Sequence, residues 1–361
     1  MEAETSRSAP PLDDPGVLRR FDRGAMLERI ATLPAQLRDG WALSRGLTLP
    51  APYREATAVL VLGMGGSAIG ADLVRGVFAD RLPVPLVVSR DHVAPAFAGP
   101  ATLVVASSYS GATEETIAAT EAALVRGCPT AVIATGGPLA EAAAAGGLPL
   151  LRFPAGGQPR AAIGWSAILL AGLLERAGQL DLSGSEVEEA AAAAAARVAS
   201  DGPEVATERN PAKQLAWSLL DRVAVVVGAD HLAPVARRWK TQLNENGKSW
   251  AAWDELPEAT HNTIVGFAQP EMGREHLFAV FLASAGDHPR TALRREVMAE
   301  QLGEAQTAHA RIEVRGTSRL AQAFDAIALG DLVSVYLAAL YGIDPTPVEA
   351  IDRCKARLVA T

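Results

Sequence analysis

The strongest constraint on the fold is a series of apolar, β-branched runs that alternate with helical segments. In the first half of the chain these runs occupy residues 57–62, 85–89, 102–106, 130–134 and 148–153. Between the third and fourth runs, the sequence TEETIAATEAALVRG indicates an amphipathic helix that ends at Gly127. Strands that are apolar on both faces are typical of a parallel sheet with helices on each side.

The second half of the chain repeats this pattern. Strands are predicted at 223–227, 277–283 and 312–315, and helices at 234–248, 288–306 and 319–341. A length of 361 residues corresponds to about two domains. We therefore expect an α/β protein with two tandem domains, each a parallel sheet flanked by helices in three αβα layers.

The predicted boundaries follow changes in composition along the chain. Residues 1–50 form a polar tail followed by one or two packing helices, and 51–184 form the first α/β domain. An alanine-rich helix at 185–203 connects it to the second domain, 204–361. This helix begins with a predicted capping box, in which Ser185 and Glu188 satisfy each other's backbone N–H groups.

Composition excludes several classes of function. Hydrophobic residues make up 49% of the chain and charged residues 20%, so it is not a disordered protein. The net charge of -8 argues against nucleic acid and anionic membranes as partners. Cys128 and Cys354 are too few for a disulfide scaffold or a thiolate metal cage. No membrane span or secretory signal is predicted, and we expect a cytoplasmic protein.

The first predicted strand ends in a glycine turn, GMGGSAIG, at residues 63–70. Gly63, Gly65 and Ala68 satisfy the dinucleotide fingerprint G-x-G-x-x-A, which is one interpretation of this turn. The acidic residue that would bind a ribose is Asp91, and it follows Gly63 by about 28 residues rather than the usual 20 or so. The nucleotide interpretation is therefore the weaker one.

The third predicted strand ends in a second turn, SSYSGATEET, at residues 107–116. Its hydroxyl groups, its glycine and the start of a helix suit a phosphate monoester, because backbone N–H groups and the helix dipole favour the anion. The alternative is ordinary capping of the helix by Ser110 or Thr113. Two serine-containing turns on neighbouring strands of one sheet favour the phosphate.

Together these turns resemble the sugar isomerase (SIS) domain, which binds phosphosugars. The resemblance implies that Ser108, Ser110 and Thr113 hold the sugar phosphate, and that Ser67 of the first turn faces the sugar beside Gly65 and Gly66. Ala68 departs from the pattern, because many members of the family have glycine there.

Motifs in both halves also resemble the bifunctional phosphoglucose/phosphomannose isomerases, which are tandem SIS-domain enzymes. The matching segments are QPRAAIG at 158–164, NENGK at 244–248, ELPEATHN at 255–262, DPTP at 344–347, and Lys355. The resemblance covers residues 55–361. It implies isomerisation of glucose 6-phosphate, mannose 6-phosphate or both to fructose 6-phosphate, without a cofactor or metal.

The same resemblance implies a role for each matching residue. Glu245 is the base that moves a proton through a cis-enediol, and Arg160 stabilises the enediolate. His261, contributed by the neighbouring subunit of a homodimer, opens the sugar ring, and Lys355 assists at the ring oxygen. Thr346 is a less securely aligned substrate contact.

The residue types suit this chemistry independently of the resemblance. A partly desolvated carboxylate is a suitable base near neutral pH, arginine keeps its charge at every working pH, and histidine titrates in the right range. The main alternative is a phosphosugar sensor without activity, although a sensor has no need of both Glu245 and His261. An isomerising amidotransferase would require an N-terminal cysteine, and the first cysteine here is Cys128.

Overall fold

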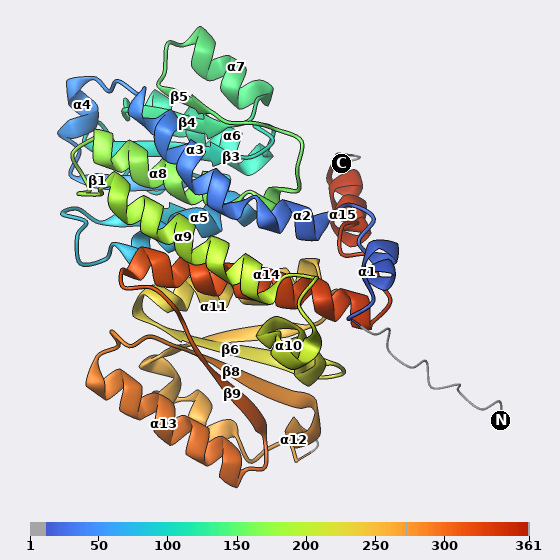
Figure 1. The fold of residues 1–361 in the computed structure, drawn as a ribbon. Coiled ribbons are helices and arrows are strands. Elements are labelled where there is room, and N and C mark those ends of the chain that lie inside the picture. The colour runs from blue at the N-terminus through green and yellow to red at the C-terminus, as the bar shows by residue number, and fades with distance from the viewer. Residues whose placement is uncertain (1–11, 272, 360–361) are drawn as a thin grey trace.

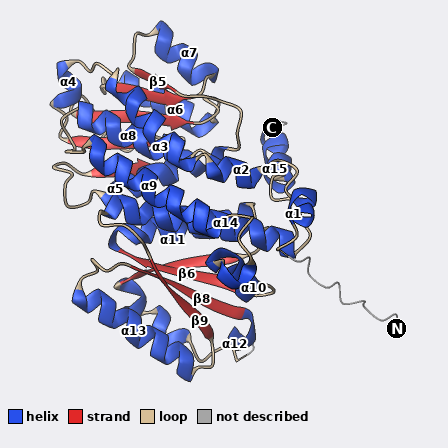
Figure 2. Ribbon diagram, viewed as in Figure 1, coloured by secondary structure: helices blue, strands red, loops and turns tan. Residues whose placement is uncertain are grey.

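The computed structural model describes residues 12–271 and 273–359 and contains two parallel β-sheets, one from each half of the chain. Figures 1 and 2 show the two sheets separated by a band of helices. This arrangement confirms the predicted α/β class, with parallel sheets flanked by helices.

The first sheet has five parallel strands in the order β2-β1-β3-β4-β5. They are β1 (Ala58–Leu62), β2 (Leu86–Ser89), β3 (Thr102–Ser108), β4 (Thr130–Ala134) and β5 (Leu150–Arg152). Leu62 pairs in register with both Ser89 and Ala106. The loops after these strands therefore leave one edge of the sheet, where parallel sheets commonly bind ligands.

Both faces of the first sheet are covered, as the apolar strands predict. Val59 and Val61 pack into the large central core with α5 (Gly65–Val77) and α8 (Ile163–Arg176). Leu60 and Leu62 point to the opposite face, against α6 (Glu114–Val125). Next to α6 on that face, α7 (Gly137–Ala145) packs on β3 and β4.

The second sheet has four parallel strands in the order β7-β6-β8-β9. They are β6 (Val223–Ala229), β7 (Ala251–Leu256), β8 (Leu277–Ala283) and β9 (Ala308–Glu313). On the outer face, Met298 and Leu302 of α13 (Pro289–Glu304) pack against Val227 and Phe281. The short helix α12 (Gly273–His276) immediately precedes β8.

The helical layer between the sheets contains one continuous core that both halves share. Its helices are α3 (Leu33–Arg45), α9 (Gly184–Asp201), α10 (Pro211–Leu219), α11 (Ala233–Glu245) and α14 (Arg319–Leu340), together with α5 and α8. Three short helices, α1 (Pro15–Phe21), α2 (Met26–Ala31) and α4 (Ala51–Arg54), add buried side chains to the same core, whereas the described side chains of α15 (Glu349–Val359) are exposed.

Helix α14 lies at the centre of this layer. Its most apolar 18-residue window has a mean hydropathy of 1.7, so by length and composition alone it could cross a membrane, but the window is entirely buried within the fold. Gly330 allows close packing here, because a Cβ at this position would lie 2.3 Å from Nε1 of Trp239 on α11. That indole nitrogen instead donates a hydrogen bond to the carbonyl oxygen of Ala326. The two helices are thus held together at a fixed spacing.

Several predicted elements differ in detail. The connecting helix, predicted to begin at Ser185, begins at Gly184 and ends at Asp201. Its cap is the Ser183 hydroxyl, which accepts from the Glu186 N–H, so the predicted capping box was wrong. Glu188 instead pairs with Arg38 on α3.

The N-terminal segment and the second half of the chain also contain elements that were not predicted. Three helices, α1 to α3, occupy the region for which one or two were expected, and β7 and α15 are additional. The last strand lies at Ala308–Glu313 rather than 312–315.

A buried ion pair joins the connecting helix to α14. The Arg197 guanidinium donates through Nε and Nη2 to the two oxygens of Asp325, each at 2.8 Å, and Nη1 donates to Asp201 at 3.2 Å. All three side chains are at most 3% exposed. Removing one partner of such a pair leaves the other as a buried, poorly compensated charge.

We therefore expect Asp325→Ala to lower the free energy of unfolding by about 3–5 kcal/mol. The control is Glu188→Ala, which removes an exposed partner of Arg38 elsewhere on the same connecting helix and should change stability little. Urea unfolding monitored by tryptophan fluorescence measures both. Similar midpoints for the two variants would show that the buried pair does not brace α9 against α14.

Candidate functional site

The turn after β1 brings the first domain's glycines and Ser67 against two other segments. A Cβ at Gly63 would lie 2.8 Å from the carbonyl oxygen of Ser107, and one at Gly66 would lie 3.0 Å from that of Pro159. Ser67 Oγ accepts a hydrogen bond from the Tyr109 N–H at 3.2 Å. The first turn therefore contacts both the turn after β3 and the segment that carries Arg160.

The turn after β3 gathers its hydroxyl groups into one cluster. Ser108 Oγ and Thr113 Oγ1 lie 2.8 Å apart, and Ser108 Oγ also accepts from the Gly111 N–H at 3.1 Å. Gly111 has a φ of +64°, and a Cβ there would lie 1.8 Å from the carbonyl oxygen of Gly136. The turn thus requires glycine at this position for both its backbone conformation and its contact with the next loop.

The capping alternative for these hydroxyl groups does not hold for Thr113. Thr113 occupies the N-cap position of α6, but its side chain makes no capping hydrogen bond and instead contacts Ser108. Ser110 Oγ makes a local bond, accepting from the Ala112 N–H at 3.2 Å. The paired hydroxyls of Ser108 and Thr113 therefore lie at the N-terminus of α6, where the helix dipole favours negative charge.

Arg160 lies in a 3₁₀ turn, Pro159–Ala161, in the first half of the chain, where it contacts the second half. Only 4% of the residue is exposed, and its guanidinium donates mainly to oxygen atoms of the second half of the chain. Nε donates to Asn246 Oδ1 at 2.6 Å, and Nη2 donates to the carbonyl oxygens of Pro345 and Thr346 at 2.9 and 2.7 Å. Burial lowers the pKa of Arg160, with Glu245 acting in the opposite direction.

The backbone of Arg160 is also fixed from the second half. Arg238 Nη2 donates to the Arg160 carbonyl oxygen at 2.9 Å and to Asp331 on α14 at 2.6 Å. Asp331 also accepts from Gln242, and burial raises the pKa of its carboxyl group. This braced pair of helices holds Arg160 in place.

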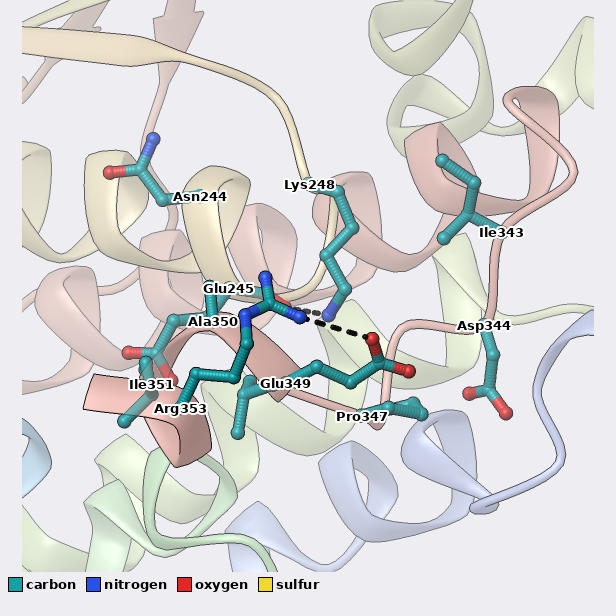
Figure 3. Close-up of a pocket in the computed structure, with 11 residues that line it drawn as sticks. Asn244, Glu245, Lys248, Ile343, Asp344, Pro347, Glu349, Ala350, Ile351 and Arg353 are labelled. Atoms are coloured by element: carbon teal, nitrogen blue, oxygen red, sulfur yellow. Dashed lines mark hydrogen bonds and ion pairs between the residues drawn. The ribbon is translucent and has the colours of Figure 1, made fainter. Parts of the chain in front are cut away.

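Glu245 is the last residue of α11, and its side chain is 32% exposed. Its Oε2 lies 3.7 Å from Arg160 Nη1, so the predicted base from the second half of the chain lies beside the predicted cation from the first half. Glu245 lines a cavity of about 560 Å³ beneath α15 (Figure 3). The cavity is lined by Asn244, Glu245, Lys248, Ile343, Asp344, Pro347, Val348, Glu349, Ala350, Ile351 and Arg353.

Lys248 enters the same cavity from the loop after α11 (Figure 3). Its ammonium group donates to the carbonyl oxygens of Pro345, at 2.9 Å, and of Glu245. Burial and the neighbouring Arg160 lower the pKa of Lys248. A second cation is thus present beside the predicted base.

The structure brings together most, but not all, of the residues singled out in the sequence. Ser108 and Thr113 contact each other, and Ser67 accepts from Tyr109 of the same turn, whereas Ser110 makes a local bond with Ala112. This group connects through Gly66 and Pro159 to Arg160 and Glu245. Thr346 contributes its carbonyl oxygen to Arg160, whereas its hydroxyl packs against Gly24 and makes no hydrogen bond within the described residues.

His261 and Lys355 lie apart from this group. Both side chains are exposed, His261 at the end of the 3₁₀ turn Glu258–His261 after β7, and Lys355 on α15. Within residues 12–271 and 273–359, no hydrogen bond or ion pair connects either one to Glu245 or Arg160. Their predicted roles remain predictions.

Sequence reasoning did not single out Asn246, Lys248, Tyr109 or Arg353. Asn246 and Lys248 both belong to the NENGK motif, so the motif itself was the available signal. Tyr109 lies inside the second turn, where its hydroxyl accepts from the Gly157 N–H at 2.9 Å and holds the loop before Arg160. For Arg353, only the structure shows that it lines the same cavity as Glu245, because α15 lies over that cavity.

Comparisons with known proteins agree with this arrangement. Residues 208–358 match the family model of the bacterial phospho-glucose isomerase C-terminal SIS domain. The chain is 37% identical over 343 residues to a bifunctional phosphoglucose/phosphomannose isomerase of Caldicellulosiruptor bescii, covering 92% of this chain and 98% of the relative. It is 32% identical to the enzyme of the same name from Aquifex aeolicus, covering 85% of this chain and 91% of that relative.

The fold has solved counterparts as well. A Thermus thermophilus structure described as a hypothetical protein superposes with a TM-score of 0.75 at 18% identity, covering 96% of this chain and 93% of that chain. The sequence similarity extends over both halves and so includes the turns around Ser108 as well as the segment around Glu245. With its two sheets and its paired Arg160 and Glu245, the chain belongs to the bifunctional phosphoglucose/phosphomannose isomerase family.

Proposed function

We propose that this protein is an aldose–ketose isomerase that interconverts glucose 6-phosphate, mannose 6-phosphate or both with fructose 6-phosphate. The single observation that carries the proposal is the pairing of the Glu245 carboxylate with the buried Arg160 guanidinium at 3.7 Å. A base and a fixed cation at one place are what a proton transfer through an enediolate requires. The family relatives bear names that describe the same activity.

The phosphate is held by the turn after β3. Ser108, Ser110 and Thr113 supply hydroxyl donors, and the N-terminus of α6 supplies backbone N–H groups and the positive end of the helix dipole. Binding the anion requires the Ser108–Thr113 hydrogen bond to be exchanged for bonds to phosphate oxygens. Ser67 and the turn around Gly65 and Gly66 extend this surface toward the sugar.

Glu245 then moves the proton between C2 and C1 of the open-chain sugar. Its carboxylate takes the C2 proton of the aldose, the C2–H electron pair forms a C1–C2 double bond, and the carbonyl electrons move onto O1. Returning the proton to C1, with transfer of the hydroxyl proton from O2 to O1, gives the ketose. Arg160 favours the intermediate because negative charge on these oxygens is greater there than in the substrate.

Opening the sugar ring requires a further acid–base group, and we propose His261 of a neighbouring subunit. His261 is exposed, and apolar side chains exposed near it in sequence are Trp250 (80%), Trp253 (36%) and Val265 (83%). Exposed apolar surface of this kind is typical of a protein interface. A homodimer would cover it and bring His261 to the partner's Glu245, with Lys355 assisting at the ring oxygen and Thr346 contacting the substrate.

A non-catalytic phosphosugar sensor would share the phosphate turn but would not need the Glu245–Arg160 pair.

The cytoplasmic location expected from the sequence is part of the same proposal, since the substrates are intermediates of central sugar metabolism.

We expect Glu245→Gln to lower kcat for both 6-phosphates by about 10³-fold, because the amide cannot accept the proton, while phosphosugar binding persists. A coupled assay of fructose 6-phosphate formation measures the rate, and calorimetry measures binding. The control is Glu141→Gln, an exposed change on α7 that should leave both unchanged. Full turnover by Glu245→Gln would refute the assignment of the base, and an inactive wild-type protein that still binds both sugars would favour the sensor.

Mixing two inactive variants tests the shared site. Equal amounts of Glu245→Gln and His261→Ala, unfolded and refolded together, should recover about a quarter of wild-type activity, because half of the dimers then carry one intact site. Each variant refolded alone should remain inactive. If the mixture also remains inactive while sedimentation shows dimers, His261 acts within its own subunit, and an active His261→Ala variant would show that His261 has no role in turnover.

A further inference from the structure

Arg160 differs from the other buried arginines in the kind of oxygen that binds it. Four arginines in residues 12–271 and 273–359 are at most 4% exposed, namely Arg160, Arg197, Arg238 and Arg295. The last three each donate directly to a buried aspartate, which offsets their charge. Arg160 donates to amide and carbonyl oxygens only, and its nearest carboxylate oxygen, in Glu245, lies beyond hydrogen-bond distance at 3.7 Å.

Asn246 is the side chain from the second domain that binds Arg160, and it is itself held at both ends. It is completely buried at the C-terminal end of α11. Arg160 Nε is only a donor, so the Asn246 amide oxygen must face it, and the Nδ2 group then donates to Ser334 Oγ at 3.0 Å. Ser334 Oγ donates in turn to the carbonyl oxygen of Asp331 on α14 at 2.6 Å.

The neutrality of this contact matters for the chemistry. An aspartate at position 246 would hold Arg160 in a similar place, but its negative charge would offset the guanidinium before any substrate charge developed. A cation held by neutral dipoles keeps its attraction for a forming anion, and a preorganised cation needs no rearrangement during the reaction.

We infer that Asn246 is a positioning residue for the isomerisation: its neutral amide, anchored by Ser334 on α14, orients Arg160 toward Glu245 and leaves the guanidinium charge available to the enediolate. This inference rests on the proposed function and deepens it. It also gives the packing of α11 against α14 a direct consequence for the reaction.

Two phosphate-containing probes separate this role from substrate binding in general. Arabinonate 5-phosphate carries a carboxylate that imitates the enediolate oxygens, whereas sorbitol 6-phosphate has a phosphate and hydroxyl groups but no carboxylate. For Asn246→Asp, titration calorimetry should show affinity for arabinonate 5-phosphate reduced by about 10- to 100-fold and affinity for sorbitol 6-phosphate within about twofold of wild type. Equal losses for the two probes would overturn the inference.

The balance between kcat and KM supplies a second readout. Arg160 acts on the charge that develops in the enediolate rather than on the bound sugar, so a change in its available charge affects turnover more than substrate binding. In Asn246→Asp, kcat should therefore fall by a larger factor than KM rises. A wild-type kcat would contradict the positioning role of Asn246.

The matched control is Asn210→Asp, the same substitution at another completely buried asparagine, which caps α10. It should lower the thermal midpoint without altering the ratio of the two probe affinities or the balance between kcat and KM. If it changes them as Asn246→Asp does, the effect is general destabilisation and the inference fails.

A second variant keeps the test decisive if Asn246→Asp does not fold. Ser334→Ala removes the anchor of the amide together with the hydrogen bond to the Asp331 carbonyl oxygen, so it should reduce affinity for arabinonate 5-phosphate by a few-fold and leave sorbitol 6-phosphate binding unchanged. If Ser334→Ala binds both probes with wild-type affinity, the inference is overturned. Failure of the proposed function itself is distinguishable, because then the wild-type protein would not isomerise either 6-phosphate.

Discussion

The buried guanidinium of Arg160 is the feature on which the rest of this structure depends. A cation that is almost fully removed from water needs several well-placed oxygen atoms, and most of those that bind Arg160 come from the other half of the chain. The two halves must therefore be fixed relative to one another before the site exists. The shared core, the completely buried helix α14 and the Arg238–Asp331 pair provide that rigidity.

Because of this dependence, the two halves of the chain contribute different groups to the site. The first half supplies a hydroxyl-rich phosphate turn and presents Arg160, and the second supplies Glu245 together with the oxygens that hold Arg160. The phosphate turn is local, since its glycine, hydroxyls and helix N-terminus lie within a few residues of one another. The proposed proton-transfer site is non-local, because its two charged groups are 85 positions apart in sequence (245 − 160) and meet through the packing of the two halves of the chain.

The sequence predicted the buried parallel strands well because continuous apolar runs such as 102–106 have few other stable locations. Strand β7 was missed because it is an edge strand, with Asp254 and Glu255 among alternately exposed residues, and it resembles a loop. The capping box failed for a local reason: Ser183, two residues earlier, already had the extended backbone and the hydroxyl that a cap requires.

For the site, the resemblance to the isomerase family identified Ser108, Thr113, Arg160 and Glu245, which the structure places in two connected clusters. It could not identify the role of Asn246, because an amide next to a catalytic candidate looks like any polar residue until its two hydrogen-bond partners are known. Thr346 was predicted as a substrate contact, but in the structure its carbonyl oxygen, rather than its hydroxyl, binds Arg160. Every residue type has a backbone carbonyl group, so contacts of this kind cannot be predicted from side-chain identity.

The central claim is that one carboxylate transfers a proton through an enediolate held by Arg160. The most direct measurement is nuclear magnetic resonance of the wild-type protein turning over glucose 6-phosphate in D₂O. Transfer by a base that exchanges with water predicts deuterium at C1 of fructose 6-phosphate, accumulating over repeated turnovers. Equilibrium reached through many turnovers with no deuterium at C1 or C2 would contradict transfer by a carboxylate that exchanges with water, and would favour direct hydride movement between the carbons over the roles given to Glu245 and Arg160.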